Sequence, residues 1–208
     1  AQSMSFSASG IIKTSDGQQI DFNLELSMQR AVYSASTTSL RLGDAVQKDP
    51  LIINFNGAAA ELTSTKFSFD LDFDGSAEQI SFVGPNSGFI ALDKNNDGTV
   101  NDGSELFGTV SGDGFRDLAA YDQDRNGWID DNDAVFSQLK AWTKDSAGND
   151  ILTGLKASGI GALYLGNVST QFDLKTTSNE SLGTLRASSV YLKENGSVGT
   201  IQDLDLTL

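Results

Sequence analysis

The sequence predicts an α+β fold made mostly of antiparallel β-hairpins around one central helix-loop-helix. Three observations support this prediction. Apolar and polar residues alternate near the N-terminus and again in residues 67–83, as in strands with one buried face. Residues 114–143 instead carry apolar residues at helical spacing. Of the 208 residues, 38% are hydrophobic and 12 are Phe, which is enough for a core.

The N-terminal region is predicted to form a hairpin over residues 5–28. Apolar and polar residues alternate strictly from Ile20 to Met28, and residues 15–18 supply a turn. Residues 29–48 are polar and weakly patterned, so we expect a connection there. The predicted division is an N-terminal hairpin and connection over residues 1–48, followed by an α+β module over residues 49–208.

The middle of the chain is predicted to pass from strands to helices. Apolar residues occupy every second position from Phe67 to Phe73 and again from Ile80. Phe115 and Leu118 share one face of a short predicted helix. The apolar residues of a second predicted helix, at i, i+1, i+4 and i+7, are Val135, Phe136, Leu139 and Trp142.

The C-terminal region returns to strands. Residues 162–165, 184–193 and 198–208 are rich in β-forming residues, and Asn195-Gly196 is a typical hairpin turn. The order of strands, helices and strands predicts mostly antiparallel pairing.

Charge and composition exclude several classes of function. The net charge of −14 and a pI near 4.1 argue against nucleic acid and anionic membranes as partners. No window approaches 18 apolar residues, so we expect no membrane insertion. The absence of Cys and His excludes structural zinc sites, thiol nucleophiles and Ser-His-Asp triads. The chain has 22 Asp, only 6 Glu and 21 Gly, a balance that favours turns and hard-cation sites.

The strongest motif is the segment of residues 122–133, the 122 loop. Calcium needs six to eight oxygen ligands, which a short loop can supply by wrapping around the ion. The segment matches an EF-hand loop at positions 1, 3, 5 and 6, although Asp stands at position 12 where Glu is usual. With predicted helices on both sides, it forms an EF-hand-like helix-loop-helix. The candidate ligands are Asp122, Asp124, Asn126, Trp128 through its backbone carbonyl, Asp130 and Asp133.

A second candidate covers residues 93–105, the 93 loop. It fits the same pattern at positions 1, 3, 5 and 6, but its Glu arrives one residue late. Either the loop is expanded by one residue and Glu105 still reaches the ion, or Asn101 and water complete the shell. The candidate ligands are Asp93, Asn95, Asp97, Thr99 through its backbone carbonyl, Asn101 and Glu105.

A third candidate covers residues 70–78, the 70 loop, and lies between predicted strands. One interpretation is a compact calcium loop; the other is an ordinary Asp-Gly hairpin turn with its carboxylates on a solvent face. Like charges on one strand face repel unless a cation neutralises them, which favours the metal. The candidate ligands are Asp70, Asp72, Asp74 and Glu78.

The three loops together predict two or three bound Ca²⁺ ions and calcium-coupled folding. Eleven of the 28 carboxylates are candidate ligands, and without cations their repulsion would oppose compaction. Residues 145–150 resemble a degenerate loop and are not counted as a site.

Several segments also resemble a known family. The runs Asp49-Pro50-Leu51-Ile52, Phe69 to Gly75, Gly88 to Asp93, Gly103-Ser104-Glu105-Leu106-Phe107-Gly108 and Leu118 to Asp122 are similar to the calcium-binding self-processing module of FrpC-type, RTX-associated secreted bacterial proteins. The resemblance covers residues 49–205, and its most specific part is Ser-Glu-Leu-Phe-Gly after the 93 loop. Residues 1–48 match no family known to us.

The resemblance implies a calcium-triggered cleavage of an Asp-Pro bond at the module's N-terminal edge, where this chain has Asp49 and Pro50. The Asp carboxylate attacks its own backbone carbonyl, a cyclic anhydride forms and the Pro nitrogen leaves; the new end can then be joined to a Lys amine. Such an intramolecular attack needs neither His nor Cys. The alternative is that Pro50 only begins a strand, a position where proline is tolerated.

Two functions are therefore carried forward. The first is a calcium-binding structural or interaction module of a secreted bacterial RTX-like protein, and the second is self-processing at Asp49–Pro50. No conventional active site is evident, because the clustered carboxylates are better explained as metal ligands than as a glycosidase pair. The partner left open is another protein or a cell-surface component. Residues 1–4 lack the features of a signal peptide. The first residue is not Met, so we expect either a fragment of a longer protein or a processed start, and the resemblance implies a secreted protein.

Overall fold

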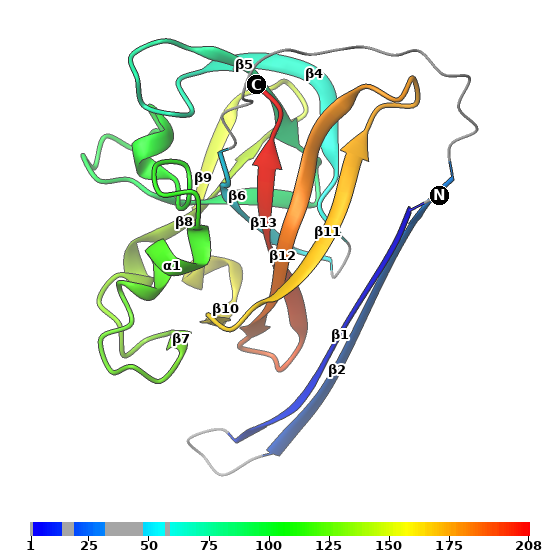
Figure 1. Cartoon of the computed structure of the whole chain (residues 1–208). Coiled ribbons are helices and arrows are strands. Elements are labelled where there is room, and N and C mark those ends of the chain that lie inside the picture. The colour runs from blue at the N-terminus through cyan, green and yellow to red at the C-terminus, as the bar shows by residue number, and fades with distance from the viewer. Residues whose placement is uncertain (1, 14–18, 32–47, 57–58) are drawn as a thin grey trace.

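The computed structural model describes residues 2–13, 19–31, 48–56 and 59–208 (Figure 1). The predicted turn at residues 15–18 and most of the predicted connection over residues 29–48 lie outside the described residues. Strands dominate the described part, which contains one α-helix, α1 (Gly114–Ala119), and three single-turn 3-10 helices at Gly103–Glu105, Phe136–Gln138 and Lys156–Ser158.

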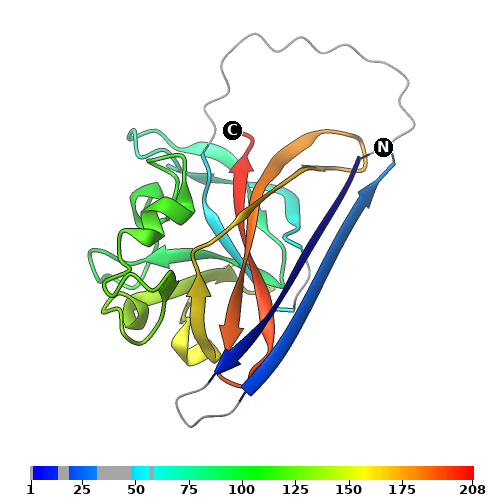
Figure 2. The ribbon, with the colours of Figure 1, turned by 60° about the horizontal axis from the view of Figure 1, so that its bottom comes forward.

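A curled, fully antiparallel nine-stranded sheet forms the centre of the protein (Figures 1 and 2). Its order is β7-β10-β12-β13-β3-β6-β8-β9, with β11 also pairing with β12. The bounds are β3 (Leu51–Asn54), β6 (Ser87–Leu92), β7 (Trp128–Ile129), β8 (Leu139–Lys144), β9 (Asp150–Gly154), β10 (Ile160–Tyr164), β11 (Val168–Lys175), β12 (Ser181–Lys193) and β13 (Val198–Leu206).

Two hairpins lie outside this sheet. One is the N-terminal hairpin of β1 (Gln2–Lys13) and β2 (Gln19–Arg30), and the other pairs β4 (Leu62–Phe69) with β5 (Glu78–Val83). Both were expected from the alternation of apolar and polar residues. In the N-terminal hairpin, β1 contacts β11 and β2 contacts β13, and Met4, Phe6 and Leu26 are buried in the core (Figure 2).

The central sheet separates two hydrophobic cores. In β3, Leu51 and Ile53 face one core and Ile52 faces the other; β8 likewise sends Leu139 to one core and Trp142 to the opposite one. Each fully buried side chain of this size contributes about 1.5–3 kcal/mol relative to exposure. The core on the hairpin side is rich in aromatic rings whose centroids lie 5.0 to 6.0 Å apart, namely Phe67, Phe69, Phe82, Phe89 and Trp142.

The predicted α+β class with an EF-hand-like helix-loop-helix is wrong. The structure is mostly antiparallel β, and within the described part of the chain the only α-helix before the 122 loop is the six-residue α1. The predicted second helix is instead a 3-10 turn followed by β8. Val135 and Phe136 are buried in the 3-10 turn, and Leu139 and Trp142 lie in β8, a strand that contacts a core on each face. The buried residues of these two elements together imitated the spacing of a helix.

Candidate functional site

The three acidic loops share one hydrogen-bonding frame. In each, the carboxylate at position 1 accepts hydrogen bonds from the backbone N–H groups of positions 5 and 6, which wraps the loop around that side chain. The donor–acceptor distances are 3.1 and 3.0 Å at Asp70, 3.2 and 2.9 Å at Asp93, and 3.2 and 3.0 Å at Asp122. The residues at positions 4 and 6 all have positive φ, at Phe73 and Gly75, Asn96 and Gly98, and Arg125 and Gly127.

A second carboxylate closes each loop. Glu105 accepts hydrogen bonds from the N–H groups of Lys94 and Asn101, at 2.9 and 3.0 Å. These donors occupy positions 2 and 9 of the 93 loop. In the 122 loop, Asp133 accepts from the same two positions, the N–H groups of Gln123 and Asp130, at 2.6 and 3.1 Å. In the 70 loop, Glu78 accepts from the N–H of Leu71 at 2.9 Å.

These closing contacts explain the late Glu of the 93 loop. Glu105 stands one position later than Asp133 but makes the same pair of backbone contacts, because its side chain is one methylene longer and the single-turn helix Gly103–Glu105 carries it inward. Both side chains are buried, with exposed fractions of 4% for Glu105 and 2% for Asp133. Buried carboxylates at the ends of acidic loops are costly unless hydrogen-bonded or paired with a cation.

Carboxylates converge in two of the loops. One oxygen from each of Asp70, Asp72, Asp74 and Glu78 lies within 4.8 Å of the others, and so do oxygens of Asp122, Asp124 and Asp133. In the 70 loop, Oδ1 of Asp72 is buried and accepts no hydrogen bond from the described residues. All of these donors are oxygen atoms, the ligands that calcium prefers. The donor sets therefore fit a hard cation, which would neutralise the carboxylates and hold the loop ends together.

The other predicted ligands are arranged differently. In the 93 loop, the side-chain amide of Asn95 donates to Asp97 and Asn101 at 3.0 Å each, and no group of three carboxylates converges there within the described residues. Thr99 donates its N–H and hydroxyl to Asp97. In the 122 loop, Asp130 stays outside the convergent trio and accepts the N–H of Asn132, while Trp128 donates its N–H to Asn126.

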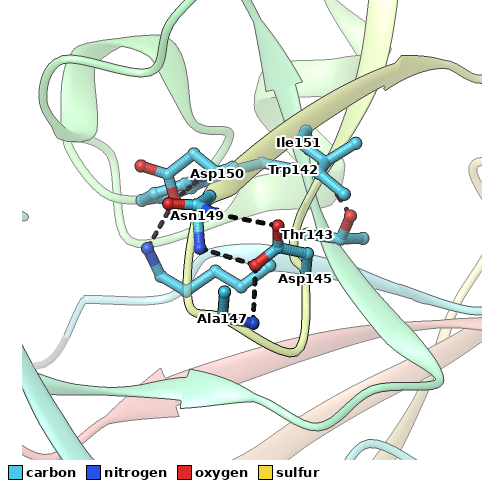
Figure 3. Close-up of polar contacts among 8 residues, drawn as sticks. Trp142, Thr143, Asp145, Ala147, Asn149, Asp150 and Ile151 are labelled. Carbon is cyan, nitrogen blue, oxygen red and sulfur yellow. Dashed lines mark hydrogen bonds and ion pairs between the residues drawn. The ribbon is translucent and has the colours of Figure 1, made fainter.

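The degenerate loop at residues 145–150 provides a contrast (Figure 3). Asp145 lies in the turn between β8 and β9 and accepts from the N–H groups of Ala147 and Asn149, at 2.8 and 2.9 Å, and from the Asn149 amide at 2.9 Å. These hydrogen bonds, first that of the Asn149 side chain, lower the pKa of Asp145. Asp150 pairs with Lys144 and accepts from the Trp142 indole. The carboxylates here are already satisfied by donors of the chain itself.

A separate group of buried carboxylates surrounds the Asp49–Pro50 bond. The N–H of Leu204 donates to the Pro50 carbonyl and that of Leu206 to the Lys48 carbonyl, both at 3.2 Å. This pairing places Asp205 of β13 directly opposite Asp49. The exposed fractions of Asp49 and Asp205 are only 8% and 3%.

The electrostatics of this group favour a bound proton. Burial, then the charge of Asp49 and the hydrogen bond with it, raise the pKa of Asp205 to about 7. Burial also raises the pKa of Asp49, while the hydrogen bond with Asp205 opposes that rise. Burial and the charges of Asp49 and Asp113 raise the pKa of Asp203 to about 8. The nearby cation is Arg186, whose Nη1 lies 3.4 Å from Oδ2 of Asp205.

The segment after the 93 loop connects the acidic loops with Asp49. The N–H of Gly103 donates to the Asp70 carbonyl at 2.8 Å, and the Phe107 carbonyl accepts the N–H of Leu51 at 3.1 Å. Gly108 packs so closely that a Cβ atom there would lie 2.0 Å from the carbonyl oxygen of Asp49. The segment from Gly103 to Gly108 is therefore the physical link between two of the loops and the Asp-Pro bond.

The sequence predictions missed Asp203 and Asp205. Both lie in the last strand, where Asp alternates with Leu204 and Leu206, a pattern that normally places carboxylates in solvent. In the structure β13 is a central strand, so both faces are buried. Two carboxylates in so apolar a strand could have indicated a buried acidic group. Their partner Asp49, however, lies too far away in the sequence to be identified from the sequence alone.

In a comparison with known protein families, residues 51–207 match the SPM domain model. The chain is also 28% identical, over 176 residues, to the iron-regulated protein FrpA of Neisseria meningitidis serogroup C. That alignment covers 75% of this chain but only 15% of FrpA. None of the described helices is long and apolar enough to cross a membrane. The family match begins immediately after Pro50 and covers most of the chain, and the protein therefore belongs to the SPM domain family.

Proposed function

We propose that this chain is a calcium-binding module of a secreted bacterial RTX-like protein, and that Ca²⁺ stabilises its fold. The observation that carries the proposal is the frame shared by the three loops. In each, the first carboxylate accepts from the N–H groups of positions 5 and 6, and the closing carboxylate accepts from the N–H of position 2. Two or three ions would bind, through the ligands predicted for the 70, 93 and 122 loops.

Charge repulsion explains why the ions would matter for stability. The 70 loop gathers four carboxylates within 4.8 Å of one another, and the 122 loop gathers three. In both loops, like charges at this distance disfavour the folded state until a cation neutralises them. At a free calcium concentration 100 times the dissociation constant, one site would stabilise the fold by about 2.7 kcal/mol.

Thermal unfolding of the full chain in chelator and in millimolar calcium tests this proposal. We expect a large calcium-dependent rise in melting temperature, reduced by Asp72→Asn in the 70 loop and by Asp122→Asn in the 122 loop. Asp145→Asn is the matched control, because it removes the same charge from a turn whose donors already satisfy the carboxylate. An unchanged melting temperature on adding calcium would refute the proposal.

The extracellular location, the partner and the division of the chain belong to the same proposal. Millimolar extracellular calcium would fill even weak sites of this kind. The partner would be another protein or a cell-surface component, with residues 1–48 forming an N-terminal hairpin and connection and residues 49–208 the calcium-binding module.

A second candidate function is calcium-triggered self-cleavage of the Asp49–Pro50 bond. The specific observation in its favour is the buried Asp49 side chain, which faces another carboxyl group at the edge of the family's matched region. The Asp49 carboxylate would attack its own backbone carbonyl carbon and form a five-membered anhydride, while the bond to the Pro50 nitrogen breaks. Water would open the anhydride, or a Lys amine would take the acyl group.

The path from the loops to this bond supports a calcium trigger. Gly103 is hydrogen-bonded to the 70 loop, Glu105 closes the 93 loop, and Gly108 packs on the Asp49 carbonyl. Ordering the loops would therefore order the groups around the bond.

Incubation of the full chain with calcium, followed by gel electrophoresis and mass analysis, tests the cleavage. We expect fragments that end at Asp49 and begin at Pro50, and none from Asp49→Ala or in chelator. An intact chain after prolonged incubation with saturating calcium would refute self-cleavage, while leaving the calcium-binding proposal standing.

A further inference from the structure

We propose that Asp205 is the catalytic acid of the Asp49–Pro50 cleavage, donating the proton that the leaving Pro50 nitrogen requires. This inference rests on the proposed self-cleavage and names a residue that would act with Asp49. Asp205 lies 156 positions away in the sequence, on the strand that pairs with the Asp-Pro segment.

The first argument is the register of β13. Leu204 and Leu206 hydrogen-bond to the backbone carbonyls of Pro50 and Lys48, so the residue between them faces Asp49 across the strand pair. Two carboxylates in directly opposite positions repel each other when both are ionised. A single shared proton removes that repulsion and converts the contact into a hydrogen bond, as in the carboxyl pairs of aspartic proteases.

The second argument is that one oxygen of each carboxyl group lacks a donor. Oδ1 of Asp49 and Oδ1 of Asp205 are buried and receive no hydrogen bond from elsewhere in the described residues. Burying an isolated charge costs roughly several kcal/mol of folding free energy unless the charge is hydrogen-bonded. A proton held between the two side chains would give these two Oδ1 atoms a hydrogen bond that no other described residue provides.

The third argument assigns the proton to one member of the pair. Two carboxyl groups face Asp205: Asp49 across the strand pair and Asp203 on the same strand. The other groups that face it are the guanidinium of Arg186 on β12 and the backbone N–H of Lys48. The hydrogen bond between the two carboxyls raises the pKa of Asp205 and lowers that of Asp49. Below about pH 7 the proton of the pair therefore resides on Asp205, and Asp49 is the member that can attack as a carboxylate. Asp113, in the loop before α1, adds a further negative charge near Asp49.

The step then balances. An oxygen of the ionised Asp49 side chain bonds to the Asp49 carbonyl carbon, and the bond from that carbon to the Pro50 nitrogen breaks. The nitrogen takes the proton of Asp205 and leaves as a secondary amine, with Asp205 becoming a carboxylate. When water opens the anhydride, its oxygen enters one of the two carboxyl groups that form; one of its protons returns to Asp205, and the other goes to the new carboxyl terminus, which ionises into solvent.

Cleavage kinetics of Asp205→Asn in the full chain with saturating calcium test this role. Asn has the size of Asp but no acidic proton, so the cleavage rate should fall by about 100-fold or more, the usual contribution of a general acid. The rate of the unchanged chain should rise with pH as Asp49 ionises and fall as the pH passes about 7, where Asp205 loses its proton. The falling limb should be absent in Asp205→Asn.

Asp203→Asn is the comparison variant, because Asp203 is also buried on the same strand but is not hydrogen-bonded to Asp49. It should change the rate less than tenfold and keep the falling limb. Calcium-dependent melting of each variant checks that the fold is retained.

A titration that does not depend on cleavage provides the second readout. The carboxyl ¹³C resonances of Asp205 are titrated in the Asp49→Asn chain and in the unchanged chain, both kept uncleaved at the same low calcium concentration. The pKa of Asp205 should be lower in Asp49→Asn, because the Asp49 charge that raises it is gone. An unchanged Asp205 pKa overturns the shared proton. Cleavage of Asp205→Asn at the unchanged rate and pH profile overturns the catalytic role alone, whereas an unchanged chain that never cleaves refutes the proposed self-cleavage on which this role rests.

Discussion

Replacing Gly108 by Ala should destabilise this protein much more than replacing Gly112 by Ala. Both glycines have positive φ, 96° at Gly108 and 75° at Gly112, so both changes carry the cost of a side chain in a left-handed backbone. Their surroundings differ. A Cβ on Gly108 would lie 2.0 Å from the carbonyl oxygen of Asp49 and 2.8 Å from the nitrogen of Gly114, whereas nothing lies within 4 Å of one on Gly112.

The magnitude follows from what would have to move. Both atoms that the new methyl group meets belong to the backbone, and the Asp49 segment is held by the contacts of Leu51 with Phe107 and of Leu204 with Pro50. We therefore place the cost at the upper end of the range for overpacking, about 3 kcal/mol. In a chain of this size that difference corresponds to a melting temperature about 6–12 °C below that of Gly112→Ala.

The assay is thermal unfolding followed by circular dichroism at one saturating calcium concentration. Both variants are made in an Asp49→Ala background, so that cleavage cannot alter the sample while the Asp49 backbone remains. Equal melting temperatures for the two variants would refute the packing of Gly108 on the Asp-Pro segment. They would also remove the physical link between the 93 loop and that bond.

Three further outcomes are expected. Asp203→Asn should be more stable than the unchanged chain at pH 8 but not at pH 4. In the unchanged chain the Asp203 carboxyl keeps its proton up to about pH 8 in the folded state but loses it near pH 3.8 in the unfolded state. The stability of the unchanged chain therefore falls as the pH rises through that window. The same stability difference at both pH values would contradict this. Glu105→Gln should reduce the calcium-induced rise in melting temperature, because the closing carboxylate of the 93 loop loses its charge; a rise equal to that of the unchanged chain would show that Glu105 does not contribute to binding. Phe6→Ala should cost about 3–5 kcal/mol if the N-terminal hairpin folds with the module, and an unchanged melting temperature would show that it does not.

Hairpins with one exposed face were the most predictable part of the fold. The alternation from Ile20 to Met28 and from Phe67 onward reflects local burial on one side, and the structure contains both hairpins. Central strands were harder to identify. β8 contacts a core on each face, and the apolar residues that end in Trp142 therefore fit the spacing of a helix as well as that of a strand.

The sequence by itself determined the acidic loops, because their conformation depends on contacts within about a dozen residues. A carboxylate at position 1, a glycine at position 6 and a closing acid are enough to specify the shared frame, even without flanking helices. The register of β13 against the Asp-Pro segment was decided only by the tertiary structure. Asp49 and Asp205 become neighbours because the central sheet buries both strands, and burial is what converts two ordinary acids into a pair that holds one proton.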